Sequence, residues 1–209
     1  MKEKYTFLDL LTIMETLRGE NGCPWDKAQT HQSIKKHTVE ESYELIEAID
    51  SGDPKKIADE SGDLLLQVVF HAAIAKDNGE YTIDDVTDAI CKKMMHRHPH
   101  IFEGKAAADW DEIKRRDRKQ KTVTEELKGI SSYLPSLMRA EKAQGKLKKA
   151  GFSDNPETPQ DPELAYGQKL YGLVQEAKDA GISLELALNR YLNHIMDQFQ
   201  QFEETKENF

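Results

Sequence analysis

The chain has 209 residues, and its 38 acidic against 29 basic side chains give a formal net charge of −9. A chain of this length can bury a sizeable core without disulfides or structural metals. The acidic excess argues against general binding to a nucleic-acid backbone, which needs clustered lysine and arginine side chains. No apolar segment reaches the roughly 18 to 20 residues that a membrane span requires, so we expect neither nucleic acid nor a membrane as a partner.

The cysteine content and the N-terminus predict where the protein works. Cys23 and Cys91 form no CxxC motif, and the first residues lack the charged and then apolar pattern of a secretory leader. A reducing cytoplasm is therefore the expected location.

Capping and periodicity signals predict helices throughout the first half of the chain. The predicted helices cover residues 7–17, 31–50, 54–76 and 83–97. Pro54 suits the first turn of a helix, Thr82 is an N-cap candidate, and Pro99 stops the fourth helix. Four helices of this length with short connections predict a bundle.

The second half of the chain is also predicted to be helical. Its helices are expected over residues 110–128, 133–152, 163–180 and from 183 to near the end. Gly151 is the expected stop of the second of these helices, and segment 153–162 is predicted to be a loop. No segment shows the sustained alternation of apolar and polar residues that marks strands, so the predicted fold class is all-α.

Five carboxylates lie in the stretch VEESYELIEAIDSGDPKKIADESGDLLLQVVFHAA, residues 39–73. Because residues three or four apart share a helix face, Glu41 converges with Glu44, and Glu60 converges with Asp63. Glu40 stands to one side. The short turn between the two helices can bring the acidic pairs face to face. Carboxylates this close repel one another, and a divalent cation is the usual resolution.

The sequence next to these acids predicts a cleft or a bundle interior. Asp63 precedes residues 64–70, in which only Gln67 is polar, and a stretch that is apolar all round is expected to be buried. Gly62 costs a helix about 1 kcal/mol relative to alanine, which predicts the close approach of a neighbouring helix or a ligand.

Oxygen ligands favour Mg²⁺, Mn²⁺ or Ca²⁺ over zinc or copper, and Mg²⁺ with open water positions suits a phosphate substrate. A di-iron site is a weaker alternative, because it normally needs Glu-x-x-His pairs that this region lacks. A zinc site at His96, His98 and His100 is disfavoured, since Pro99 interrupts the element and no fourth ligand is evident.

Several blocks of the sequence resemble one family. EESYE followed by ESGD matches the EExxE and ExxD pattern of the MazG family of nucleoside triphosphate pyrophosphohydrolases. Further blocks occur in family order, namely GCPWDKAQTH, LLLQVVFHA, RHPHIF, WDEIK and LPSLMRAEKAQGKLKKAGF. These ordered blocks are spread between residues 22 and 152 of the chain.

The resemblance implies a MazG-like helical bundle that assembles as a homodimer or a higher homo-oligomer. It also implies Mg²⁺-dependent cleavage of nucleoside triphosphates between the α and β phosphates, with Mn²⁺ as a substitute, giving a monophosphate and pyrophosphate. Carried onto this chain, the metal ligands are Glu41, Glu44, Glu60 and Asp63. Glu40 is a further ligand or, with Glu41, the group that activates water.

The resemblance also supplies candidates for substrate binding. Lys93 and Arg97 fit the family's pair of basic phosphate contacts, and Trp110 and Lys114 repeat the same spacing on the next helix. Trp110 offers a ring to stack on a base, and Lys114 offers a cation for phosphate. Trp25 either lines the nucleotide pocket or caps the bundle, and the sequence leaves both roles open.

An internal repeat divides the chain into two predicted modules, residues 1–127 and 128–209. Aligning Gly62 with Gly167 pairs ESGDLLLQVVFHAA with AYGQKLYGLVQEAK. The helices that follow these segments also correspond.

The second copy has lost the residues that carry the chemistry in the first. Ala165 and Gln168 replace the acids, while His194 and Gln198 replace the basic pair. We therefore expect a catalytic first module and a degenerate second module that serves dimerisation, packing or regulation.

Two other functions are compatible with the sequence. One is a non-catalytic nucleotide-binding or regulatory helical dimer, which would not need to retain all five acids together with Lys93 and Arg97. The other is a related hydrolase acting on dUTP or on a phosphoribosyl nucleotide. The sequence leaves open the preferred nucleotide, the number of metal ions, and the choice between dimer and tetramer.

Overall fold

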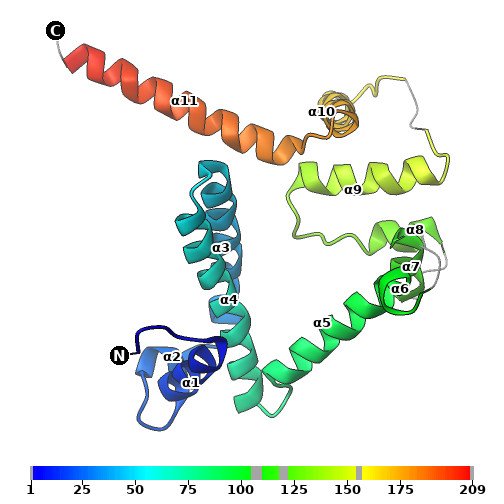
Figure 1. The fold of residues 1–209 in the computed structure, drawn as a ribbon. Coiled ribbons are helices and arrows are strands. Elements are labelled where there is room, and N and C mark those ends of the chain that lie inside the picture. Colours follow the sequence, from blue (N-terminus) through cyan, green and yellow to red (C-terminus); the bar gives the residue numbers. More distant parts are fainter. Residues whose placement is uncertain (1, 105–109, 118–121, 154–156, 208–209) are drawn as a thin grey trace. The chain divides into compact units, whose positions relative to one another are not determined.

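The computed structural model describes residues 2–104, 110–117, 122–153 and 157–207, and of α7 it does not describe the side chains of residues 110–112 and 114. Every regular element in the described ranges is a helix, which confirms the all-α prediction. The chain forms two compact units, residues 1–107 and 108–209 (Figure 1). The predicted module boundary at residue 127 falls inside α8 (Val123–Lys128), within the second unit.

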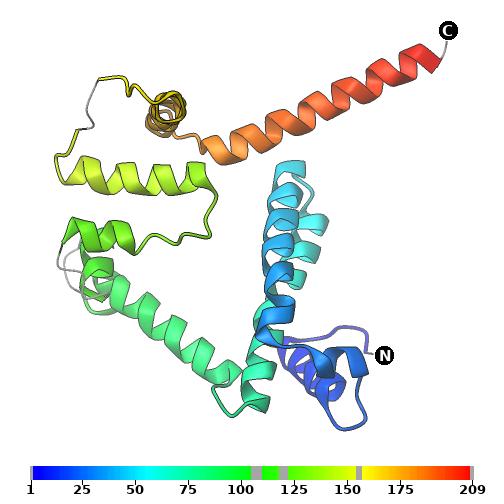
Figure 2. The same ribbon diagram turned by 180° about the vertical axis from the view of Figure 1, so that it is seen from behind.

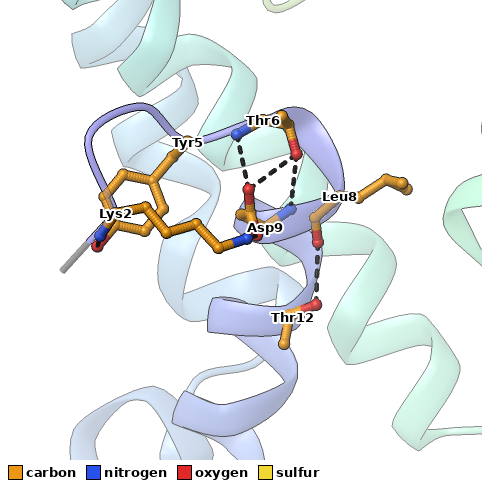
Figure 3. Close-up of polar contacts among 6 residues, drawn as sticks. All are labelled: Lys2, Tyr5, Thr6, Leu8, Asp9 and Thr12. Carbon is orange, nitrogen blue, oxygen red and sulfur yellow. Dashed lines mark hydrogen bonds and ion pairs between the residues drawn. The ribbon is translucent and has the colours of Figure 1, made fainter.

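The first unit opens with α1 (Phe7–Arg18), whose N-terminus is fixed by a capping box. Thr6 Oγ1 accepts a hydrogen bond from the Asp9 amide, and Asp9 Oδ2 accepts one from the Thr6 amide (Figure 3). Lys2 Nζ lies 2.5 Å from Asp9 Oδ1. The Lys2 and Thr6 hydrogen bonds favour the ionised carboxylate and lower the pKa of Asp9 to about 2.

A short helix that the sequence analysis did not predict follows the first. Helix α2 (Pro24–Ala28) begins with a proline at its first position and packs on α1. Arg18 ties this corner together, because Arg18 Nη2 lies 2.8 Å from Asp77 Oδ2 and Nη1 donates to the Asp26 and Gln29 carbonyls. The guanidinium also stacks over the Phe70 ring.

Helices α3 (His31–Ser51) and α4 (Pro54–Asp77) form an antiparallel hairpin, and both views show them side by side (Figures 1 and 2). Gly52 ends α3 with φ of 69°, a left-handed conformation that glycine adopts without strain. Asp53 then caps α4 by accepting a hydrogen bond from the Lys55 amide at 2.9 Å, and Pro54 starts the helix. The predicted turn and both helix starts are therefore confirmed.

The core of this unit lies where α1 and α3 cover the second half of α4. Its buried members are Met14, Ile34, Val69, Phe70 and Ile74. Truncating a buried phenylalanine of this kind to alanine typically costs about 3–5 kcal/mol. The hairpin thus has an apolar end that holds it in place.

The structure corrects two expectations about α4. Residues 64–70 are not buried all round, because Leu65 and Val68 are each 41% exposed. A Cβ atom built on Gly62 would meet no described atom within 4 Å, so no neighbouring helix approaches closely there. Within one copy, this face of α4 is open rather than packed.

Helix α5 (Ile83–Arg97) starts at the predicted N-cap Thr82, ends where predicted, and is followed by α6 (Pro99–Phe102). Helix α5 contacts α4 near the turn between them and then runs away from the hairpin in both views (Figures 1 and 2). None of its residues is buried, and Ile90, Met94 and Ile101 of α5 and α6 are between 42% and 67% exposed. One copy of the first unit therefore leaves an apolar face of α5 uncovered among its described residues.

The second unit contains α7 (Trp110–Asp117), α8 (Val123–Lys128), α9 (Ser136–Lys149), α10 (Pro162–Asp179) and α11 (Leu184–Glu207). The single helix predicted over residues 110–128 was wrong. Thr122 has extended backbone and accepts a hydrogen bond from the Glu125 amide, so α8 begins with a capping box of its own. Gly151 has φ of 73° just beyond α9, which confirms the predicted stop.

Helix α10 packs on α9, and α11 contacts both. An apolar stripe on α11 repeats with the four-then-three spacing of a coiled-coil seam. Its members are Leu188, Leu192, Ile195, Phe199 and Phe202, and each is at least 42% exposed. No described helix combines the length with the apolar composition that a bilayer span requires.

A histidine pair links the start of α3 to the second half of α4. The His31 and His71 rings stack with centroids 5.0 Å apart, and their Nδ1 atoms lie 2.7 Å from each other. One ring must donate and the other accept, so the bond fails once both Nδ1 atoms carry protons. Tyr81 also stacks on His31, and Glu80 Oε2 lies 3.5 Å from His31 Nε2.

We predict that the first unit loses stability in mild acid through this pair. Burial and the neighbouring His31 lower the pKa of His71 below its usual 6.5, so the unfolded chain takes up the proton more readily. The contribution of His71 to stability is complete above that value and is lost as the pH falls through the depressed pKa. The urea midpoint should therefore fall between about pH 7.5 and about pH 5.5, and His71→Gln should remove roughly half or more of that fall.

The matched control is His100→Gln, since His100 is an exposed histidine of the same unit. It should leave the pH dependence unchanged. A His71→Gln protein with the pH dependence of the unaltered chain would contradict the role assigned to the pair.

Candidate functional site

Three of the predicted carboxylates meet on the α3–α4 hairpin. Glu41 of α3 and Glu60 and Asp63 of α4 each offer an oxygen, and these oxygens lie within 4.8 Å of one another. Glu60 and Asp63 share a face because they are three residues apart on one helix, and the tight turn places Glu41 opposite them. Glu41 and Glu60 are half-buried, while Asp63 is exposed.

The negative charges of this cluster act on one another and raise the pKa of two of its members. Burial and the charges of Asp63, Glu44 and Glu60 raise the pKa of Glu41, and His37 partly opposes them. Burial and the charges of Glu44 and Asp63 raise the pKa of Glu60 as well. The charge on each carboxylate therefore makes it harder for the others to ionise. A bound cation would neutralise the repulsion between these negative charges.

The remaining predicted acids differ in their surroundings. Glu44 lies outside the closest group of oxygens, but its charge raises the pKa of both Glu41 and Glu60. Glu40 instead accepts a hydrogen bond from His37 Nδ1 at 2.7 Å and lies 3.8 Å from Lys36 Nζ. Within this structure Glu40 is held beside the cluster and not in it.

Two contributors were missed by the sequence analysis. His37 supports Glu40, and the charge of Glu47 adds to the raised pKa of Glu60. Both lie three residues from a predicted acid, His37 before Glu40 and Glu47 after Glu44. Helical spacing alone could therefore have added them to the acidic face.

Two buried oxygens next to the cluster have no hydrogen-bond partner in the described structure, Thr38 Oγ1 and Gln67 Oε1. Thr38 lies one turn before Glu41, and Gln67 lies one turn after Asp63 on the antiparallel partner. Buried polar atoms are rarely left without a partner unless water, an ion or a ligand supplies one. The carboxylate oxygens of Glu41, Glu60 and Asp63 fit a hard divalent cation such as Mg²⁺.

The two predicted phosphate contacts of the first unit lie on α5, outside the acidic hairpin. Lys93 and Arg97 lie on the part of α5 that leads away from the hairpin, and Lys93 is exposed. The side chains of Trp110 and Lys114 lie outside the described residues. Trp25 packs at a tilt on Phe70 with ring centroids 6.3 Å apart, yet it remains 57% exposed.

Comparison with known proteins identifies the family. A family model described as the MazG nucleotide pyrophosphohydrolase domain matches residues 29–102, a span that contains the whole acidic hairpin. The chain is 35% identical over 219 residues to the Thermotoga maritima protein named nucleoside triphosphate pyrophosphohydrolase/pyrophosphatase MazG. That alignment covers 95% of this chain and 86% of the relative. The chain belongs to the MazG family.

Two further relatives are similar to this chain over two thirds or more of its length. An Escherichia coli protein named nucleoside triphosphate pyrophosphohydrolase is 36% identical over 225 residues, covering 93% of this chain and 86% of the relative. The uncharacterized Bacillus subtilis protein YabN is 45% identical over 147 residues, which are 67% of this chain and 30% of YabN. The three converging carboxylates lie within the span that the MazG family model matches.

We predict that Mg²⁺ stabilises the folded protein through these acids. A ligand at about one hundred times its Kd adds about 2.7 kcal/mol, enough to raise Tm by several degrees in a chain of this size. Asp63→Asn should abolish this rise. It should also leave the metal-free Tm equal or higher, because it removes charge that raises the pKa of Glu41 and Glu60. Thermal unfolding with and without Mg²⁺ measures both effects.

Asp50→Asn is the matched control, because Asp50 is an exposed aspartate near the end of the same hairpin. It should keep the full Mg²⁺ shift. An Asp63→Asn protein that retains the Mg²⁺ shift would place the cation elsewhere.

Proposed function

We propose that this protein is a Mg²⁺-dependent nucleoside triphosphate pyrophosphohydrolase that cleaves between the α and β phosphates. The products are then a nucleoside monophosphate and pyrophosphate. The observation that carries the proposal is the convergence of Glu41, Glu60 and Asp63 inside the MazG domain span. The names of the relatives describe the same class of activity. Clearance of non-standard nucleotides is one use of such an activity.

The residues of the hairpin fit this chemistry. Glu41, Glu60 and Asp63 would hold Mg²⁺, or Mn²⁺ in its place, with Glu44 completing the acidic face. When bound, the metal neutralises triphosphate charge and acidifies a coordinated water. Glu41 is half-buried with a raised pKa, which suits a group that accepts a proton from water. Glu40 is poised beside it through His37 and would serve as a second acceptor.

A non-catalytic nucleotide-binding or regulatory protein is the alternative. A protein that served assembly alone would not need a cluster of carboxylates whose mutual repulsion raises the pKa of two of its members. Such a cluster costs stability in the absence of a cation, and metal-assisted hydrolysis gives a reason to retain it. The enzyme is therefore the better supported function.

The first prediction from this function concerns the products and the acids. A panel of nucleoside triphosphates with Mg²⁺ should yield the monophosphate and pyrophosphate rather than orthophosphate. Asp63→Asn or Glu41→Gln should lower kcat by about a hundredfold or more, because each removes a metal ligand. Asp50→Asn should retain full turnover. Release of orthophosphate alone would defeat the assigned bond cleavage.

We further propose that the active form is a homodimer or a larger homo-oligomer in which copies share each site. Within one copy, the half of α5 that carries Lys93 and Arg97 leads away from the acids (Figures 1 and 2). The exposed Ile90 and Met94 of α5, the open face at Gly62, and the apolar stripe of α11 all offer surface to a second chain. A basic pair from one copy would then bind the phosphates held at the acids of another.

Complementation between two variants with reduced activity tests whether two copies share each site. Glu41→Gln removes an acid, and Lys93→Gln removes a phosphate contact and should lower kcat/KM about tenfold or more. Each heterodimer of the two variants contains one site with both intact groups. The co-expressed mixture should therefore show roughly a quarter of the unaltered activity if the chains assort at random, and the heterodimer isolated through two affinity tags should show roughly half.

Two results would contradict the shared site. One is a co-expressed mixture that is no more active than the average of the separate variants. The other is a fully active protein that sediments as a monomer at assay concentration. Either result would require Lys93 to act within its own copy or not at all.

We also propose that the two modules have different roles. The family model ends at residue 102, and the acids lie in the first unit. Helix α10 begins with an aspartate cap and a proline, Asp161 and Pro162, as α4 does at Asp53 and Pro54. We assign catalysis to the first module, at work in the cytoplasm. We assign assembly or regulation to the second.

A further inference from the structure

The second unit contains a basic pocket of about 850 Å³ between α8, α9 and α10. Six basic side chains line the pocket, namely Arg115, Lys142, Lys146, Lys148, Lys149 and Lys178. The acidic side chains of the lining are Glu126 and Asp179. A chain with a net charge of −9 has therefore gathered positive charge at one place.

Two of these lysines are neutralised inside the pocket. Lys146 Nζ lies 2.8 Å from Glu126 Oε2, and Lys148 Nζ lies 3.1 Å from Asp179 Oδ1. Lys142 has no ion-pair partner among the described residues. Among the described residues that line the pocket, the basic side chains outnumber the carboxylates, and clustered cations of this kind attract an anion.

A hydrogen bond to a backbone carbonyl of α9 holds the Lys178 side chain in the pocket. Its ammonium donates to the Glu141 carbonyl at 2.8 Å, so its charge is fixed in place by a neutral acceptor. A Cβ atom on Gly145 would lie 2.7 Å from Lys178 Nζ, so the ammonium lies close against the backbone of α9. A partly buried, positioned cation binds a phosphate group with less loss of side-chain entropy than a free surface lysine.

The pocket also has an apolar wall. Val123 of α8, together with Ile130 and Leu134 of the segment before α9, lines the same space as the lysines. Ser131 and Gln175 add hydroxyl and amide groups that can hydrogen-bond a ligand. Binding sites for small molecules combine such an apolar lining with a few placed polar groups.

We infer that this pocket binds a small molecule carrying two or more phosphate groups and a flat, apolar part, as in a nucleoside diphosphate. The lysines would bind the phosphates, and the wall at Ile130 would receive the base. The volume is within the range of pockets for small ligands. None of the residues that line it is a predicted metal ligand, so the site is separate from the acids of the first unit and does not depend on the proposed activity.

Calorimetry on the full-length protein tests this inference. The protein carries Glu41→Gln and Asp63→Asn to disable the acidic site, and EDTA removes metal ions. ADP should bind, and inorganic pyrophosphate should bind more weakly because it cannot use the apolar wall. Arg115→Gln with Lys142→Gln should weaken ADP binding by about tenfold or more, since each removes a charge-assisted contact.

The matched control is Arg190→Gln with Lys169→Gln, which makes the same charge change at exposed positions of the same unit outside the pocket. It should leave ADP affinity unchanged. Equal affinity of both double variants, or no ADP binding at millimolar concentration, would overturn the inference. Binding of a single-stranded oligonucleotide through Arg115 and Lys142 without binding of ADP would also overturn it.

Because these measurements use a metal-free protein with a disabled acidic site, their failure differs from failure of the proposed function. An active hydrolase with no ADP affinity in this assay would retain the function and lose the second site. If the unaltered protein showed no hydrolase activity but ADP bound through Lys142, the second site would stand and the proposed function would fail.

Discussion

The repulsion among carboxylates on two antiparallel helices is the constraint around which the first unit is built. Glu41, Glu60 and Asp63 bring three oxygens within 4.8 Å of one another, an arrangement that helical propensity alone would not favour. Apolar packing at the opposite end of the same hairpin offsets this repulsion. Phe70, Val69 and Ile74 bury apolar surface against α1 and α3, so packing at one end holds together the charges at the other.

The sequence predicted most of what depends on local signals. Thr82, Pro54 and Gly52 set helix boundaries through caps and backbone conformations that are properties of single residues, and each boundary was confirmed. The convergence of Glu41 with Asp63 was also predictable, because a short turn between antiparallel helices leaves few alternatives. The capping box at Thr122 shows that a missed boundary can have an equally local signal.

The remaining errors concern tertiary context. The apolar run before Phe70 was expected to be buried on all sides, yet Leu65 and Val68 are partly exposed because no described helix covers that face. Gly62 was expected to allow a close approach that is absent within one copy. Periodicity shows which residues are apolar but not which neighbour covers them, and a surface completed by another chain looks the same in sequence as a core. The basic pocket was missed for a similar reason, since α9 supplies four of its lysines while Arg115 comes from α7 and Lys178 from α10.

The tight turn at Gly52 makes the length of the hairpin as important as its composition. Each residue advances an α-helix by about 100° and about 1.5 Å, so inserting or deleting one residue between Pro54 and Glu60 would rotate Glu60 and Asp63 away from Glu41. The caps, the charges and the apolar residues would all survive such a change, and the helices would still form. Relatives of this chain should therefore tolerate substitutions in this stretch more readily than changes in its length.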